Sequence, residues 1–307
     1  MKNQIFYTLI IILFSWSVKA QQLPNSSLIS ETRAFWNPAF TALHNDMIVN
    51  GFFRMQWFGF EGAPMSGFID LEYPLVDYNM SAGAAFIFDK TGPVSKLGGQ
   101  INYVYKLKEF LSRNGQLSLG ISGNFMQYAL NTSSQIVNEN NDPIFNNNRI
   151  SSFFPALGGG FYYTSNIRNW KGNSFFLGAS MKQIITTEIL VNGLDQVREN
   201  HIHFNIGGRI VSYNSAYEPM VVVNYVTPDI IDVLYGLKYE MEDTFWAGLG
   251  YGGSGMASIQ GGLILPEMGT NNAMMKIGVL ANYHLGSEVA KAGPSAEFYI
   301  GYYLRKK

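Results

Sequence analysis

Two histidines separated by one residue are the first candidates for chemistry in this chain. His201 and His203 would lie on the same face of a strand, where two imidazoles can share a metal ion. The chain contains no cysteine, and no cluster of carboxylates lies nearby in the sequence. The pattern therefore favours a polar interior or loop position for both histidines over a metal site.

A second candidate is an oxygen-rich stretch at residues 138–148, with the sequence N-E-N-N-D-P-I-F-N-N-N. Carboxylate and amide oxygens are the ligands that Ca²⁺ prefers, but the stretch lacks the ligand spacing of a Ca²⁺-binding loop. It is more typical of a solvated external loop.

The third candidate is a hydrolytic pair, since His284 and Ser287 lie near an expected loop. Nothing in the sequence supplies an acid to orient the histidine, and no G-x-S-x-G, H-E-x-x-H or P-loop motif occurs. We therefore expect a protein that is not an enzyme and that holds no metal or cofactor. A membrane enzyme would need a convergent nucleophile and base that the sequence does not offer.

The composition indicates which kind of protein presents these residues. Charged residues make up 14% of the chain, well under the usual quarter, whereas aromatic residues reach 15% and glycine 32 positions. Such a composition suits a surface that faces hydrocarbon and is ringed by interfacial aromatic side chains. A large soluble β-sandwich is the alternative. The net charge of −1 makes nucleic acid an unexpected partner.

The N-terminal residues are predicted to be a secretory signal. Lys2 is followed by an uncharged apolar run at residues 5–18, and Val18-Lys19-Ala20 suits a cleavage site before Gln21. An uncleaved anchor is the alternative, although the apolar run is short for a membrane span. We expect three parts, namely a signal peptide over 1–20, a polar periplasmic or plug-like segment over 21–46, and a barrel over 47–307.

Alternating runs of about ten residues dominate the remaining chain and predict strands long enough to cross a membrane. In the first run, Phe53, Met55 and Trp57 would face an apolar phase, and Arg54 and Gln56 a wet one. The fourteen runs are residues 50–57, 65–73, 78–89, 95–107, 115–130, 152–164, 174–182, 201–212, 217–226, 230–241, 245–253, 256–265, 274–285 and 295–304.

The connections between these runs favour a barrel over a sandwich. The two longest, residues 131–151 and 183–200, both follow odd-numbered strands, whereas turns such as 213–216 and 242–244 follow even-numbered strands and are short. Long outer loops and short inner turns are typical of outer-membrane barrels. The sequence therefore predicts an all-β fold, a transmembrane antiparallel β-barrel of about 14 strands, with the first and last strands paired because hydrocarbon does not tolerate an open edge. The glycines at 158–160 predict a bend or bulge.

The polar positions of the strands would then project into the lumen. Both charge signs occur there, which favours a cross-linked polar network over an ion filter of one sign. The predicted network contains Arg54, Asp70, Glu72, Arg209, Lys238, Glu240 and Glu297.

Several short motifs give the chain a resemblance to a known family. They are Asn37-Pro38-Ala39-Phe40, Arg54-x-Gln56-Trp57, Glu61-Gly62-Ala63-Pro64, Asp89-Lys90-x-Gly92-Pro93 and Gly115-x-Leu117-Ser118-Leu119-Gly120. As an ordered set over about the first 130 residues, they resemble the PorP/SprF family of Bacteroidetes outer-membrane proteins, which is linked to type IX secretion and gliding motility. The final strand looks like the closing strand of the family, but Arg305-Lys306-Lys307 follows it in place of a terminal aromatic residue.

The resemblance implies an accessory role in the outer membrane. Such barrels are thought to bind the C-terminal domain of a secreted adhesin, holding it at the surface, and to contact the periplasmic type IX apparatus. The contact regions would be residues 131–151 and 183–200, with residues 58–64 between them. Arg54, Gln56 and Trp57 would either support that loop or only pin the strand register. A channel for small solutes or hydrophobic molecules is the alternative function.

Overall fold

The structure is a computed structural model of the 307-residue chain. It describes residue 28 and residues 30–131, 149–167, 172–186, 189–191, 194–196, 200–228, 230–253, 255–266, 273–285 and 293–305. The expected signal peptide and the asparagine-rich stretch at 138–148 lie outside these residues. Within them, no helix is both long enough and apolar enough to cross a membrane.

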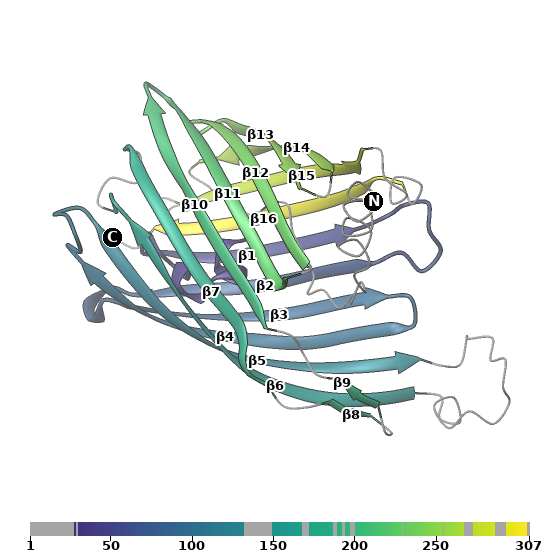
Figure 1. Ribbon diagram of the computed structural model, residues 1–307. Helices are drawn as coiled ribbons and strands as arrows, with labels where there is room; N and C mark the ends of the chain where they lie inside the picture. The colour runs from purple at the N-terminus through teal and green to yellow at the C-terminus, as the bar shows by residue number, and fades with distance from the viewer. Residues whose placement is uncertain are drawn as a thin grey trace, which may run out of the picture.

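Fourteen antiparallel strands close into a barrel, as the alternating pattern predicted (Figure 1). The strands are β1 (Asp46–Met55), β2 (Met65–Leu75), β3 (Met80–Thr91), β4 (Val94–Lys108), β5 (Gln116–Asn131), β6 (Arg149–Thr164), β7 (Ser174–Thr186), β10 (His201–Ser212), β11 (Ser215–Thr227), β12 (Ile230–Met241), β13 (Phe245–Gly252), β14 (Met256–Leu265), β15 (Ala273–His284) and β16 (Ser295–Arg305). A separate two-stranded sheet, β8 (Ile189–Val191) with β9 (Leu194–Gln196), lies between β7 and β10, where the sequence pattern predicts a loop.

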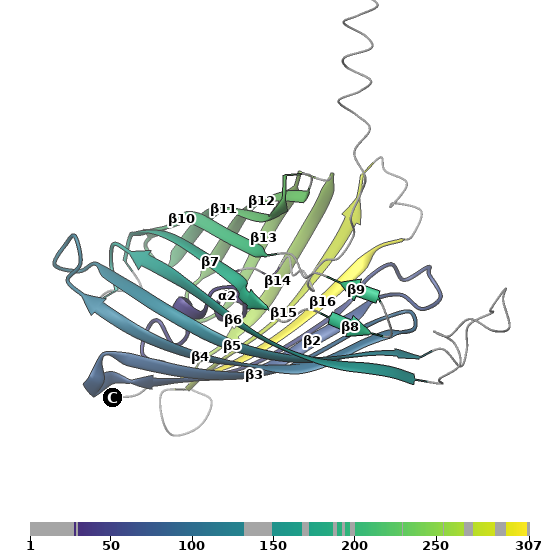
Figure 2. The ribbon, with the colours of Figure 1, turned by 60° about the horizontal axis from the view of Figure 1, so that its bottom comes forward.

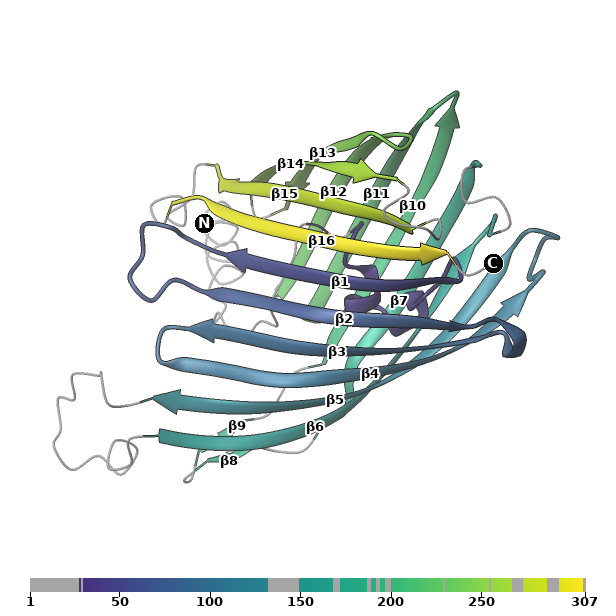
Figure 3. The same ribbon diagram turned by 180° about the vertical axis from the view of Figure 1, so that it is seen from behind.

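The seam between the first and last strands is continuous, and β1 and β16 lie side by side (Figure 3). Their register runs from Asp46 opposite Arg305 to Met55 opposite Ala296. Closure gives the backbone N–H and C=O groups of both strands hydrogen-bond partners. These groups need partners within the protein because the hydrocarbon core of the membrane contains no water. The glycine-rich part of β6 shows the expected irregularity, a register shift between Leu157 and Gly159.

The strand alternation separates a lipid-facing exterior from a polar interior. Along β2, Ile69, Leu71 and Tyr73 are exposed on the outside, whereas Asp70 and Glu72 between them are buried on the inside. This is the arrangement expected when hydrocarbon replaces water around the barrel.

The connections divide the barrel into two ends. β5 ends and β6 begins at the same end of the barrel as residues 56–64, which join β1 to β2 (Figure 3). We call this the outer end, because longer loops face the cell exterior in such barrels. The inner end carries the short β10–β11 and β12–β13 turns.

The end of the first strand differs from the expectation. β1 stops at Met55, and Trp57 has a left-handed φ of 54° instead of continuing the apolar face. Residues 56–64 form a compact loop in which the Gln56 amide donates to the Pro64 carbonyl at 2.9 Å. The strand therefore ends two residues before its apolar alternation does, and the loop that Gly59, Gly62 and Pro64 favour begins at Gln56.

Candidate functional site

A short segment before β1 lies inside the barrel, and we call residue 28 with residues 30–45 the plug segment. It contains the helix α2 (Arg33–Trp36) and the 3₁₀ helix η1 (Pro38–Phe40), and α2 is visible within the ring of strands (Figure 2). Leu28 donates its amide to Glu297 near the outer end of β16, and Asn45 precedes β1 at the inner end. The plug segment therefore runs along much of the lumen.

The motif Asn37-Pro38-Ala39-Phe40 fits the plug segment to the wall. The Asn37 side chain accepts a hydrogen bond from the Ala39 amide at 3.0 Å and donates to the Phe161 carbonyl at 2.9 Å. Opposite it, a Cβ added to Gly120 would lie only 2.4 Å from the Ala39 nitrogen. The glycine allows the plug backbone to approach β5 closely.

The end of the plug segment is held to β2, β3 and β4 through backbone atoms and the Thr41 hydroxyl. Ser81 donates to the Thr41 carbonyl at 2.6 Å, and the Asn102 amide donates to the Thr41 hydroxyl at 3.0 Å. The Ala42 amide donates to Glu72, and the Ala42 carbonyl accepts from Lys106. These contacts satisfy buried backbone groups, so this part of the plug behaves as part of the wall.

The opposite wall holds the plug segment by charge. Glu31 pairs with Lys238, and Arg33 lies 3.2 Å from Glu218. These wall residues are themselves linked to other charged groups, because Glu218 lies 3.0 Å from Arg209, which lies 2.7 Å from Glu240.

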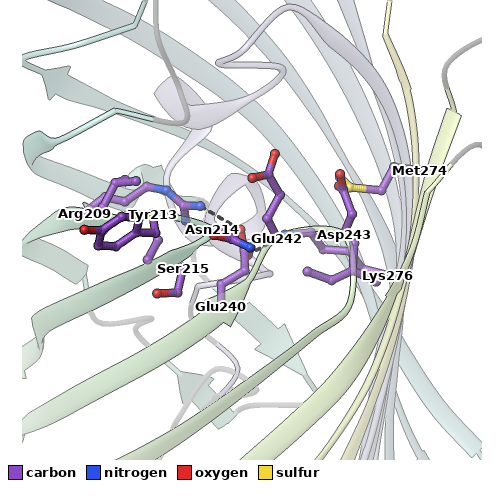
Figure 4. A pocket seen from close by; sticks show the side chains of 12 residues that line it. Arg209, Tyr213, Asn214, Ser215, Glu240, Glu242, Asp243, Met274 and Lys276 are labelled. Carbon is purple, nitrogen blue, oxygen red and sulfur yellow. Dashed lines mark hydrogen bonds and ion pairs between the residues drawn. The ribbon is translucent and has the colours of Figure 1, made fainter.

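Glu240 is the centre of this wall network. Its carboxylate lies 2.7 Å from Arg209, 3.0 Å from Lys276 and 3.4 Å from Lys238. Figure 4 shows Arg209, Glu240 and Lys276 around an opening at the inner end of the barrel.

The seven polar residues expected in the lumen are all buried or half-buried there, but they form three clusters instead of one network. Arg209, Lys238 and Glu240 form the first, at the wall just described. Asp70 and Glu72 both accept hydrogen bonds from Asn50 in the second.

The third cluster crosses the barrel seam near the outer end. Arg54 and Glu297 are direct partners in the strand register, with their charged groups 3.4 Å apart. Glu297 is 0% exposed and also accepts hydrogen bonds from Leu28 and from Asn282. The pair therefore joins the first strand, the last strand and the tip of the plug segment.

The sequence prediction missed several charged contributors to the lumen, among them Glu31, Arg33 and Glu218. The alternation of Glu31 and Arg33 within an otherwise uncharged stretch was the available signal. Glu218 lies in a strand whose apolar alternation is blurred by three consecutive valines, which hid its inward direction.

The three histidines considered for metal binding or catalysis lie within strands of the barrel. His203 is buried, its ring nitrogen lies 2.5 Å from the Asn224 side-chain oxygen, and its ring stacks on Trp36 at 5.6 Å. His201 is half-buried at the start of β10, and His284 ends β15. Ser287 lies outside the described residues. Among the residues that the structure describes, no three potential metal ligands cluster.

The remaining motif residues build the outer end. The Gly92 amide donates to the Gly62 carbonyl at 3.0 Å, and the Asn131 amide donates to the Pro93 carbonyl at 3.0 Å. On the other side, the Phe58 amide donates to the Pro294 carbonyl at 3.1 Å. These bonds link residues 56–64 to the neighbouring connections on both sides, and we call this linked region the outer platform.

Two aromatic side chains stand exposed on the outer platform. Phe58 is 51% exposed and Phe60 is 63% exposed. Ala63 and Pro64 complete the loop, and Asp89 just below it pairs with Lys96 at 2.9 Å. An exposed aromatic pair on a cross-linked backbone can bind a partner with little loss of conformational freedom.

The charges around the Glu31 carboxyl predict how docking of the plug segment depends on pH. Burial alone would raise the pKa of the Glu31 carboxyl, but Lys238 and Lys276 outweigh this effect and hold the pKa below its usual value of 4.5. A carboxyl with a lowered pKa stabilises the folded state above its usual pKa and loses that contribution as the pH falls through the lowered value. We therefore expect the plug segment to stay docked from neutral pH down to the usual carboxyl pKa of 4.5 and to loosen only below it.

A fluorophore on a cysteine that replaces Ser30 would report this, because the chain has no cysteine of its own. Loosening between neutral pH and about pH 5 would contradict the prediction. The Glu31→Gln variant should abolish the acid step.

The architecture defines the class of protein. A closed antiparallel barrel with an apolar exterior and a polar lumen is an integral outer-membrane protein. Among solved structures, the chain is similar to the CymD monoaromatic hydrocarbon channel, with 11% identity, coverage of 92% of this chain and 95% of that chain, and a TM-score of 0.55. A Pseudomonas aeruginosa FadL homologue matches at 9% identity and a TM-score of 0.48, over 92% and 95% of the two chains. At these identities, the likeness to CymD shows a shared fold, while the second score is too low to support an argument.

The family follows from the sequence itself. Residues 18–302 match the profile described as type IX secretion system membrane protein PorP/SprF, and the chain belongs to this family. The protein is therefore an outer-membrane barrel that works with components of the type IX secretion system. No curated protein matches the chain.

Proposed function

We propose that this barrel holds a surface adhesin exported by the type IX system at the outer face of the membrane, by binding the C-terminal domain of that adhesin. The proposed role is one of binding and not of catalysis. It deepens the family assignment, which gives a part in type IX secretion without naming the cargo.

The outer platform is the observation that carries the proposal. Phe58 and Phe60 are exposed at the end of the barrel that faces the cell exterior, and the backbone beneath them is bonded to both neighbouring connections. Large aromatic side chains on a rigid support are frequent anchors of protein interfaces. The Arg54–Glu297 pair lies below the platform and fixes the seam that supports it.

Two long connections are expected to contact cargo, residues 131–151 and 183–200. Residues 132–148 of the first lie outside the described residues, as do 187–188, 192–193 and 197–199 of the second. The β8–β9 sheet belongs to the second of them and lies at the same end as the outer platform (Figure 1). A single surface formed by these elements would suit a folded domain better than a short peptide.

The plug segment fills space that the alternative function, a permanently open channel, would require. It occupies the lumen with Phe35 and Trp36 packed into an apolar cluster that also contains Phe52, Phe68 and Leu280. A permanently open pore would need that volume to be free. Planar-bilayer recordings test for a permanently open channel, since such a channel would show steady conductance and a barrel with its plug segment seated should not.

A double Phe58→Ser and Phe60→Ser variant tests the proposal in the native host. We expect the adhesin to be made in normal amounts but to shift from the cell surface into the medium, as it would on deletion of the barrel. The measurement is the distribution of adhesin between washed cells and culture supernatant, with a soluble type IX cargo followed in parallel.

The matched control is a double Leu111→Ser and Tyr213→Ser variant at the inner end, where these side chains are 81% and 99% exposed. It should leave the adhesin on the cells. Retention of adhesin by the outer-platform variant, with the barrel folded, would refute the proposal, and so would equal release by both variants.

A further inference from the structure

The plug segment is held by two different kinds of contact on its two sides. Towards β2–β7, residues 36–45 are bonded through uncharged groups, both backbone groups and the side chains of Asn37 and Thr41. The Trp36 carbonyl, for example, accepts from Ser180 at 2.8 Å. Towards β11, β12 and β16, residue 28 and residues 30–33 form two ion pairs and a hydrogen bond to Glu297. Arg33 also donates to the Tyr162 hydroxyl at 3.3 Å and lies over the Phe176 ring at 4.7 Å, and these two contacts stay on the side of the anchor. We call residue 28 with residues 30–33 the latch and residues 36–45 the anchor.

The wall that faces the latch would keep its charges paired if the latch moved away. Lys238 would lose Glu31 but retain Glu240 at 3.4 Å, and Glu218 would lose Arg33 but retain Arg209 at 3.0 Å. The latch also carries one charge of each sign, so its departure would leave the net charge of the lumen wall unchanged. Breaking a buried ion pair is costly mainly when it leaves a lone buried charge, and this wall avoids that outcome.

The anchor has no comparable freedom. Its release would leave the Thr41 carbonyl and both Ala42 backbone groups without their present partners on Ser81, Lys106 and Glu72. Unpaired backbone groups in a buried site are expensive, so the anchor should stay in place when the latch moves.

Space already exists beside the latch. A cavity of about 150 Å³ lies between latch residues, including Glu31 and Arg33, and the wall residues Glu218, Lys238 and Lys276. At the other end of the latch, Leu28 is fully buried in the apolar cluster with Leu280 and Tyr299. The latch therefore closes the cavity at one end and completes the apolar seal at the other.

From this arrangement we propose that the plug segment is a gate with a fixed half and a moving half. The latch swings away from β11, β12 and β16 while the anchor remains on β2–β7, and the space that opens along the charged wall conducts small hydrophilic ions and solutes. This activity goes beyond the anchoring of cargo and does not depend on it.

Reconstituted full-length mature chain in planar bilayers provides the test, with potassium chloride as the permeant probe. Glu31→Gln removes the negative charge that forms the ion pair with the Lys238 ammonium, and we expect openings at least about tenfold more frequent than in the unmodified chain. A cysteine that replaces Ser30 should then react faster with a membrane-impermeant maleimide. The matched control is Glu61→Gln in the exposed outer loop, which should change neither quantity.

A disulfide tether distinguishes the latch from the whole plug. A Cβ added to Gly83 would lie 2.7 Å from the Thr41 methyl group, so a Gly83→Cys and Thr41→Cys pair would fix the anchor to β3. Added to Glu31→Gln, the tether should leave the new conductance intact under oxidising and reducing conditions alike.

Conductance that disappears on oxidation of the tether would overturn the proposal, because the whole plug would then be the moving part. Faster labelling without conductance would overturn it too, and so would no change in either quantity in a barrel that still shows the gel shift of a folded form. If Glu31→Gln fails to fold, Arg33→Gln tests the same latch with the same outcomes, since Glu218 retains Arg209.

Discussion

Replacing Glu240 by glutamine is expected to lower the free energy of unfolding by about 3 to 5 kcal/mol. The carboxylate of Glu240 lies within 3.4 Å of Arg209, Lys238 and Lys276, and it is the group common to all three. Glutamine keeps the size and the hydrogen-bonding oxygen but removes the negative charge. Three cations would then share a buried wall with Glu218 and Glu31 as their remaining partners.

The measurement is the urea midpoint of unfolding in lipid vesicles, followed by the gel shift between folded and unfolded barrels. Glu242→Gln is the matched control, because Glu242 lies two residues further on in an exposed inner turn. A midpoint for Glu240→Gln equal to that of Glu242→Gln would show that the wall network contributes nothing to stability.

Replacing Gly120 by leucine is expected to displace the plug segment from the lumen. The first side-chain carbon would lie 2.4 Å from the Ala39 nitrogen and 2.6 Å from the Pro38 carbonyl carbon, both backbone atoms that cannot rotate aside. Overpacking a buried contact costs about 1 to 3 kcal/mol even where neighbours can relax. Here the clash falls on the motif that seats the plug, so undocking relieves it more readily than repacking.

A cysteine that replaces the fully buried Thr41 reports the displacement through its reaction with a maleimide. We expect slow labelling in the parent chain and fast labelling in Gly120→Leu. Gly123→Leu is the control on the same strand, since a Cβ at Gly123 would meet nothing within 4 Å. Equally slow labelling in both leucine variants would mean that the plug segment is not held by its fit to β5.

These experiments address separate parts of the molecule. The Glu240 network and the Gly120 contact support the lumen and its plug segment, whereas Phe58 and Phe60 belong to the outer platform. A variant of the lumen that unseats the plug but leaves adhesin on the cell would indicate that recognition occurs on the surface alone.

The barrel could be predicted from the alternation of apolar and polar residues alone. Strand number, strand pairing and the inward or outward direction of residues such as Asp70 and Ile69 follow from a side-chain period of two, which is a local property of each strand. The division into long outer and short inner connections could likewise be counted along the chain. The motif Asn37-Pro38-Ala39-Phe40 was visible too, but its role as the seat of the plug segment on Gly120 was not.

Which inward-facing residues contact one another could be seen only in the folded barrel. Arg54 contacts Glu297 because closure of the barrel places β1 beside β16, and Glu31 reaches Lys238 because the plug segment crosses the lumen. Such contacts depend on the stagger of the strands around the whole barrel and on the path of a segment without periodicity. Neither quantity is present in the alternation of any single strand, so the sequence could name the inward charges but not their partners.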